Sequence, residues 1–219
     1  MATDVTYSSL VADVTNYIER GGSAVTDETV YNQIPRLINA AERKIMQALK
    51  LQGTIEILVD ATGFTSGTSV IAKPDRWRQT VSFWYGSGTS SNSRTLLLPR
   101  SYDYLRNYWP DDSVTGAPAY YADYDYQHFL IAPTPDATYP IELLAYMQPE
   151  YLDETNQQNF FSNYTPNMLL YGTLLEAAPF LKDDERIQTW QGLWGFEAQT
   201  LGAQDLQRIL DRTSKRDRP

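Results

Sequence analysis

The sequence predicts an α+β protein in which a helical bundle, formed by the N- and C-terminal segments, is interrupted by a β-rich insertion. Three observations support this prediction. Apolar residues recur at helical spacing in 1–52 and again in 161–212, and after Gly53 short β-type runs alternate with glycine and proline turns. We therefore expect a bundle made of 1–52 and 161–212, an insertion at 53–160 and a tail at 213–219.

Helices are expected throughout the segment before Gly53. The first is Tyr7–Arg20, which the glycines that follow it end, and Thr26 or Asp27 begins the next. Pro35 marks either a kink or the first turn of a long amphipathic helix. Its apolar face consists of Ile34, Leu37, Ile38, Ala41, Ile45, Ala48 and Leu49, with Glu42, Arg43, Lys44 and Gln47 off that face.

The insertion is expected to contain short strands joined by turns. Asp125-Tyr126 is a plausible hairpin turn, and Tyr102–Tyr108 could be a short helix that Pro110 stops. The polar segment Gln148–Ser162 is expected to be extended and to lead back to the bundle. The predicted strands are Thr54–Asp60, Thr68–Ala72, Gln79–Tyr85, Thr95–Leu98, Ala119–Tyr124, Gln127–Ala132 and Ile141–Met147.

The C-terminal part is expected to form two consecutive helices. Thr165 suits the N-cap and Pro166 the first helical position. Two adjacent apolar rows follow, which predicts a largely buried helix that kinks or ends near Pro179. Acidic residues 183–185 then favour the start of a second helix. Since that helix contains Gly192, Gly195 and Gly202, we expect close packing of its backbone against a neighbour.

Charge is unevenly distributed along the chain. The net charge is −9, which argues against a general phosphate-binding surface. No lysine or arginine occurs in 107–181, which holds 10 acidic residues. The last 15 residues carry five basic side chains and three aspartates. This polarity suits a protein whose two ends meet different partners, although it is equally consistent with solvated faces.

Composition excludes several classes of site. There is no cysteine, and therefore no disulfide or thiol chemistry. No secretory leader and no apolar run near 18 residues is found, so we expect a cytoplasm-like compartment and no membrane. His128 is the single histidine and is expected to be structural or exposed. We therefore expect no metal, no cofactor and no catalytic residue.

Two kinds of site remain open on the residues alone. Paired carboxylates could serve a glycosidase, the candidates being Asp111/Asp112, Asp123/Asp125 and Asp153/Glu154, but such pairs in loops are usually only solvated. The 16 tyrosines and five tryptophans would suit a carbohydrate-binding module or a protein interface. The most interface-like run contains Tyr120, Tyr121, Tyr124 and Tyr126.

The chain resembles the head–tail adaptor, or connector, proteins of tailed bacteriophages, the group that includes tail tubular protein A. The resemblance rests on the ordered combination of several pieces, which together cover most of the chain. They are Ile34–Ile45, Gly116–Tyr121, Ile131–Ile141, Tyr146, Asn167–Ala178 and Lys182–Arg186.

This resemblance implies a structural virion protein without enzymatic activity. It would be made in the host cytoplasm and placed at the head–tail junction. Around twelve copies would form a ring that joins the portal protein to the tail tube or nozzle protein, with DNA passing through transiently. The family commonly grips the portal with its C-terminal segment. That role would fall here on Arg208, Arg212, Lys215, Arg216 and Arg218, and the tyrosine run would face tail proteins or neighbouring subunits. The alternative is a carbohydrate- or surface-binding module that uses the Tyr-rich β region.

Overall fold

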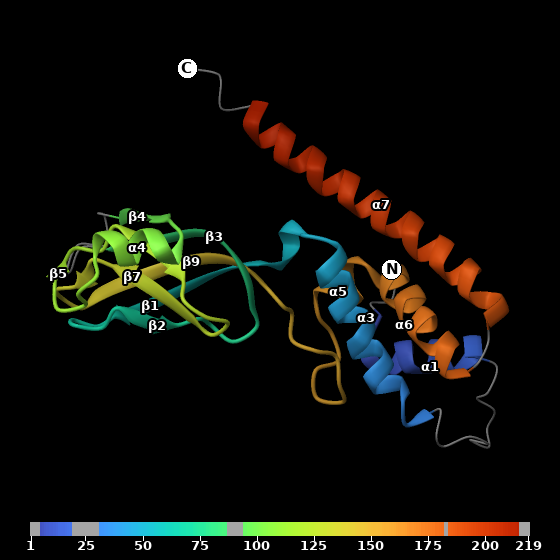
Figure 1. Cartoon of the computed structure of the whole chain (residues 1–219). Coiled ribbons are helices and arrows are strands. Elements are labelled where there is room, and N and C mark those ends of the chain that lie inside the picture. Colours follow the sequence, from blue (N-terminus) through green and yellow to red (C-terminus); the bar gives the residue numbers. More distant parts are fainter. Residues whose placement is uncertain (1–4, 19–30, 87–93, 182–183, 215–219) are drawn as a thin grey trace. The chain divides into compact units, whose positions relative to one another are not determined.

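The computed structural model describes residues 5–18, 31–86, 94–181 and 184–214, without the side chains of 184–185 and 206–214. The chain forms two compact units (Figure 1). One, the helical unit, is Met1–Thr54 with Gln148–Pro219, and the other, the sheet unit, is Ile55–Met147. The boundaries predicted at 52, 160 and 212 stay a prediction, because compactness does not test whether a segment folds alone.

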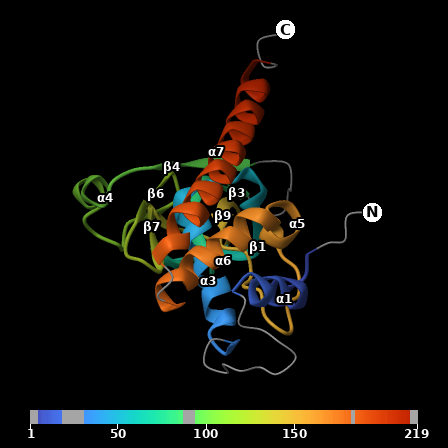
Figure 2. The ribbon, with the colours of Figure 1, turned by 90° about the vertical axis from the view of Figure 1, so that its right-hand side faces the viewer.

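The helical unit is built around one apolar helix, α6, which contacts α1, α3, α5 and α7 (Figure 2). The second helix expected near Thr26 lies outside the described residues. Pro35 proves to lie in the first turn of α3, with Gln33 at the N-cap. The helices are α1 (Tyr7–Ile18), α3 (Ile34–Ala48), the 3-10 turn η1 (Gln52–Thr54), α5 (Phe160–Tyr164), α6 (Pro166–Leu181) and α7 (Asp184–Ser214).

As the two apolar rows predicted, α6 is largely buried. Met168, Leu169, Leu174 and Ala177, which are distributed around the helix, are all buried. Gly172 sits where three helices meet. A Cβ at that position would lie 3.2 Å from Cβ of Ala41 and 3.3 Å from Nε1 of Trp194, so glycine permits the close approach of α3 and α7.

The glycines of α7 do not have the role that the sequence suggested. A Cβ added to Gly192 or Gly195 would meet nothing within 4 Å, and one added to Gly202 would meet only Leu49, at 3.9 Å. The prediction of close backbone packing along α7 is therefore wrong. Large side chains make most of the contact instead, since Trp190, Trp194 and Leu201 pack on the helical core together with the smaller Ala198.

The expectation for the segment before α6 also needs correction. Gln148–Ser162 is not extended throughout, because α5 begins at Phe160. A capping box between Asn159 and Ser162 starts this short helix. Thr165 terminates α5, and its hydroxyl donates back to the carbonyl of Phe161 at 3.2 Å. Its carbonyl, rather than its side chain, accepts the first bond of α6, from Leu169.

Glu42 was expected off the apolar face of α3, and this expectation is wrong. Its side chain is 0% exposed. Its carboxylate accepts from Nδ2 of Asn159 at 2.5 Å and from the backbone N–H of Leu152 at 3.4 Å. With its amide nitrogen turned toward Glu42, Asn39 donates to the same carboxylate at 3.2 Å. These bonds join α3 to the segment that leads from β9 to α5.

The sheet unit holds a seven-stranded sheet in the order β1-β9-β3-β4-β6-β7-β2 and a two-stranded sheet of β5 and β8. Pairing is antiparallel except for β4 with β6 and β5 with β8. A short helix, α4 (Tyr102–Tyr108), follows β4 as predicted. The strands are β1 (Ile55–Phe64), β2 (Val70–Ala72), β3 (Trp77–Gly86), β4 (Arg94–Pro99), β5 (Thr115–Gly116), β6 (Tyr120–Asp123), β7 (His128–Ala132), β8 (Thr134–Pro135) and β9 (Tyr139–Met147).

The large sheet is curled around an aromatic core. Rings of Phe64, Phe83 and Phe129 pack there with Leu143 and Met147 of β9. Irregular register in β1 and β3 accompanies the curl, because a bulge increases the local bend and twist of a strand.

Gly63 lies at the irregularity in β1. A Cβ there would collide with the side chain of Ile141 as it now lies, so glycine lets β1 and β9 keep this spacing without a shift of Ile141.

The predicted fold class is therefore wrong. We expected a helical bundle with a β-rich insertion, whereas the chain is a mixed α/β protein with 44% helix and 29% strand. The large sheet has its own core, so it is a principal part of the architecture. The expectation failed because β1 and β3 are ten residues each, longer than the runs that alternation indicated.

The buried Glu42 predicts a specific pH dependence of stability. Burial raises its pKa from 4.5 to about 7, against the opposing effects of the Asn159 and Leu152 hydrogen bonds and of Arg43. Between these two pH values the folded chain binds more protons than the unfolded one, so the free energy of unfolding falls as pH rises. We expect Glu42→Gln to remove a fall of roughly 3 kcal/mol between pH 4.5 and 8.

Urea unfolding of the wild type and the variant at pH 5 and pH 8 measures this difference. Glu56→Gln, at an exposed carboxyl of β1, is the matched control and should keep the wild-type dependence. A Glu42→Gln variant with an unchanged pH dependence would contradict the assignment.

Candidate functional site

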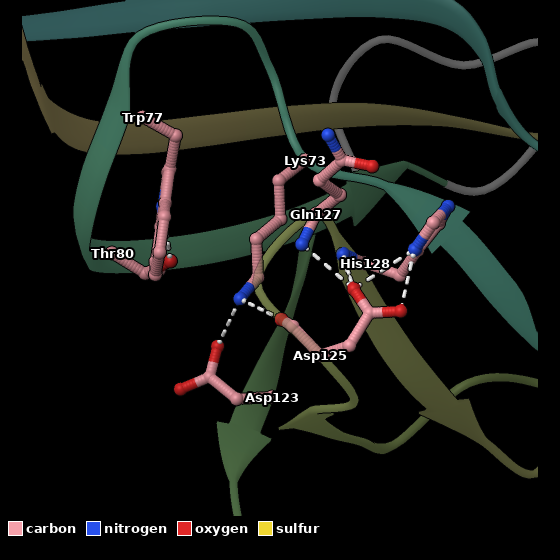
Figure 3. A network of polar contacts seen from close by, with 7 residues as sticks. All are labelled: Lys73, Trp77, Thr80, Asp123, Asp125, Gln127 and His128. Atoms are coloured by element: carbon pink, nitrogen blue, oxygen red, sulfur yellow. Dashed lines mark hydrogen bonds and ion pairs between the residues drawn. The ribbon is translucent and has the colours of Figure 1, made fainter.

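The turn between β6 and β7 is organised by one carboxylate. Oδ1 of Asp125 accepts from the backbone N–H groups of Gln127 and His128, both at 2.7 Å (Figure 3). Its carboxylate also lies 2.9 Å from Nδ1 of His128. Desolvation would raise the pKa of Asp125, but these hydrogen bonds outweigh it and lower that pKa. His128 thus braces the turn, consistent with the structural role expected for it.

Lys73, just after β2, fixes the hairpin to the rest of the sheet unit. Its ammonium pairs with Asp123 at 2.9 Å and donates to the carbonyl of Asp125 at 2.8 Å (Figure 3). It also lies 4.2 Å from the ring centroid of Trp77 and 5.0 Å from that of Phe129. The side chain is only 5% exposed, so this cation is desolvated yet has both anionic and aromatic partners.

The four tyrosines predicted as an interface differ in exposure. Tyr121 is 8% exposed and belongs to the core of the sheet unit, in contact with Phe83. Tyr120 is half-buried among Tyr104 and Trp109. The rings of Tyr124 and Tyr126 are exposed, the latter 86%.

A larger aromatic surface includes α4, which sequence reasoning treated only as a helix. Tyr102 contacts Tyr124, and Tyr104 contacts both Tyr108 and Tyr120. Guanidinium groups cover three of these rings, since Arg106 lies over Tyr102 and Arg100 lies over both Tyr104 and Tyr120. The run Tyr102–Trp109 has four aromatic residues in eight positions, so the signal was present in the sequence.

A second exposed apolar surface was also missed, on the edge strand β1. Ile57 and Val59 point to the same face and are 64% and 71% exposed. Leu96 and Leu98 of β4 are exposed as well. Exposed apolar side chains grouped in this way are typical of contacts with other proteins.

Two of the five predicted portal contacts lie in the C-terminal helix, α7. Arg208 and Arg212 lie in α7, but their side chains are not among those described, and Lys215, Arg216 and Arg218 lie outside the described residues. The described part of α7 exposes Leu193 and Phe196, the latter 68%, whereas Trp190 and Trp194 pack on the helical core. α7 therefore has one apolar stripe packed on its own unit and further apolar side chains open to solvent.

The paired carboxylates serve turns and ion pairs. Asp112 pairs with Arg106 at 2.6 Å. The hydrogen bonds from Ser113 lower the pKa of Asp111, and those from Thr155 and Asn156 lower the pKa of Asp153. A general acid of a glycosidase needs a raised pKa instead, so these two groups are poorly suited to that role. Within the described residues no group of His, Asp and Glu could hold a metal ion.

We expect Lys73→Ala to lower the free energy of unfolding by roughly 2–4 kcal/mol, because it removes a buried cation together with its ion pair and ring contacts. Lys50→Ala, at an exposed lysine, is the control and should change stability by less than about 0.5 kcal/mol. Thermal or urea unfolding measures both. Equal effects of the two substitutions would contradict the conclusion that Lys73 fixes the β6–β7 hairpin to the rest of the sheet unit.

Comparison with known proteins identifies the family of this chain. No helix in the described ranges combines the length and the apolar character needed to cross a bilayer. No curated protein matches the sequence. The family model described as SU10 adaptor protein matches residues 5–219, which confirms the resemblance to phage adaptors. The chain therefore belongs to the SU10 adaptor protein family and is a structural adaptor of bacteriophage particles.

Proposed function

We propose that this chain is a head-to-tail adaptor that forms a ring, joins the portal to the tail and leaves a path for DNA. The observation that carries the proposal is the family match, which extends over residues 5–219 rather than over one unit. Both the helical unit and the sheet unit then belong to the adaptor. Its place would be the head–tail junction of the virion.

The C-terminal end of α7 is the proposed portal contact. This end is basic, with Arg208 and Arg212 in the helix and Lys215, Arg216 and Arg218 after it. The rest of the chain is acidic, so the end differs from it in charge and would meet an acidic protein surface. The length of α7, 31 residues, supports the proposal. Its Asp205 is still in contact with the rest of the helical unit, where it accepts from the backbone N–H of Gln52. Arg208 and Arg212 follow that contact in the sequence, toward the C-terminal end of the helix.

The aromatic surface of the sheet unit is the proposed contact with tail proteins or neighbouring subunits. Within it, Tyr124 contacts Tyr102 of α4 and Tyr120 contacts Tyr104. The exposed ring of Tyr126, two residues after Tyr124, is assigned to the same contact. Tyr121 would contribute indirectly, because its buried ring anchors β6 to the core of the sheet unit. Tyrosine is favoured at protein interfaces because it buries a large area with few rotatable bonds.

Transient passage of DNA requires a lining with little attraction for phosphate. The net charge of −9 supports this part of the proposal, because non-specific DNA affinity comes from neutralising phosphates with lysine and arginine. A ring also needs a heterologous interface whose rotation closes. The exposed apolar groups on β1 and on α7 are surfaces of the kind that such an interface needs.

Native mass spectrometry tests the ring directly. The purified protein has a mass of 25.0 kDa as a monomer, and we expect it to join the portal ring encoded beside it in a stoichiometry close to one copy per portal subunit. An unrelated phage's portal is the control. A chain that stays separate from its own portal would contradict the adaptor role.

Removal of Thr213–Pro219 tests the portal contact. We expect the truncated chain to bind the portal at least tenfold more weakly, because three of the five basic residues are lost, while circular dichroism stays unchanged. The full-length variant Lys215→Gln/Arg216→Gln/Arg218→Gln should show the same loss if charge is responsible. Arg36→Gln, at an exposed arginine of α3, is the control. Full attachment of the truncated chain would exclude this role.

A further inference from the structure

The large sheet contains a gap where one strand changes neighbours. β4 pairs with β3 from Arg94 to Leu97 and then with β6 through Leu98 and Pro99. The first six residues of β3, Trp77–Ser82, are therefore paired only with β9. Their other edge faces the end of β4 and the strand β6, and backbone groups on such an edge are open to a further partner.

Arg78 stands at this gap because of a bulge. Trp77 is opposite Met147 and Gln79 is opposite Tyr146, so Arg78 is an extra residue in β3. Bulges re-aim the side chain of the extra residue. Among the described residues, the exposed guanidinium of Arg78 has no hydrogen bond, ion pair or ring contact. None of the described carboxylates is therefore paired with this cation.

A pocket of about 360 Å³ lies in the gap and has a second arginine in its wall. Arg100 is held over the rings of Tyr104 and Tyr120, with centroid distances of 5.7 and 5.6 Å. Its backbone N–H donates to the carbonyl of Tyr121, which fixes the end of β4. The lining consists of Trp77, Arg78, Gln79, Thr80, Pro99, Arg100, Tyr121, Ala122 and Asp123.

The one carboxylate in the lining does not neutralise the two arginines. Asp123 is already paired with the buried ammonium of Lys73, at 2.9 Å (Figure 3). Arg78 and Arg100 therefore give the pocket a positive charge that the described residues leave uncompensated. Arginine is well suited to carboxylates, because its planar group can donate two parallel hydrogen bonds.

We propose that this pocket, between the start of β3 and the end of β6, binds a glutamate- or aspartate-bearing extended segment of another protein. Arg78 and Arg100 pair with its carboxylate, and the open edge of β3 receives its backbone. The pocket has room for one or two side chains, whereas DNA affinity needs a row of lysines and arginines along a phosphate backbone. An acidic protein segment therefore fits better than DNA.

The inference uses the proposed adaptor role only in taking the occupant to be a protein of the same particle. Its test uses the full chain and a synthetic peptide, without portal. A negative peptide result would contradict the pocket proposal but not the adaptor role. A chain that fails to bind the portal would contradict the adaptor role but not peptide binding in the pocket.

The probe is the peptide acetyl-Val-Glu-Thr-Glu-Val-amide, titrated into the ¹⁵N-labelled full-length chain and followed by backbone amide signals. We expect shifts at Gln79, Thr80, Ala122 and Asp123, and none with the peptide in which glutamine replaces both glutamates. Arg78→Gln should weaken binding at least tenfold without altering thermal stability, because its exposed guanidinium makes no hydrogen bond, ion pair or ring contact with the described residues. Arg94→Gln, at an arginine of the same sheet paired with Glu142, is the matched control and should bind as the wild type does.

Three results would overturn the proposal. One is the absence of shifts at these four residues up to millimolar peptide. Another is equal affinity of Arg78→Gln and the wild type. The third is a stronger response of the same signals to a ten-nucleotide oligothymidine than to the peptide, which would identify a phosphate site.

Discussion

The helical unit depends on one constraint, which is that α6 has apolar residues over most of its circumference and must be covered on most of its sides. α1 and α3 cover it from one end of the sequence, and α5 and α7 from the other. Gly172 allows that cover to be close, since Ala41 and Trp194 both approach its Cα. The chain therefore has to return to the bundle after the sheet unit. The hydrogen bonds of Glu42 with Asn159 and Leu152 hold the returning segment against α3.

Much of the secondary structure could be predicted from the sequence, and the errors have physical causes. α1, α3, α4 and α6 were found because their apolar spacing and proline or glycine boundaries are local signals. The size of the sheet was missed because its longest strands are irregular. β1 contains Gly63, which reads as a break, although the glycine is needed to pass Ile141. Glu42 was misplaced because its partners, Asn159 and Leu152, are more than 100 residues away in the sequence. α5 is only five residues long and depends on its capping box.

The candidate surfaces were predictable in composition but not in arrangement. The tyrosine run was recognised, yet strand alternation places Tyr121 of β6 in the core. Tyr124 and Tyr126 follow that strand, in the turn, and are exposed. Local sequence did not show that α4 would add Tyr102 and Tyr104 to the same surface. Arg78 carried no signal at all, because its position follows from a bulge and from the change of neighbour by β4. Pairing between distant strands decides such sites, and composition does not.

The strands at the two ends of the sheet unit are neighbours, since Ile55 of β1 is opposite Tyr146 of β9. The chain therefore enters and leaves this unit at adjacent points of one antiparallel pair. A segment with such neighbouring ends can be lengthened, shortened or exchanged without stretching the chain on either side of it. The sheet unit can accordingly be replaced as a cassette in the course of evolution, while α6 and the helices around it stay unchanged.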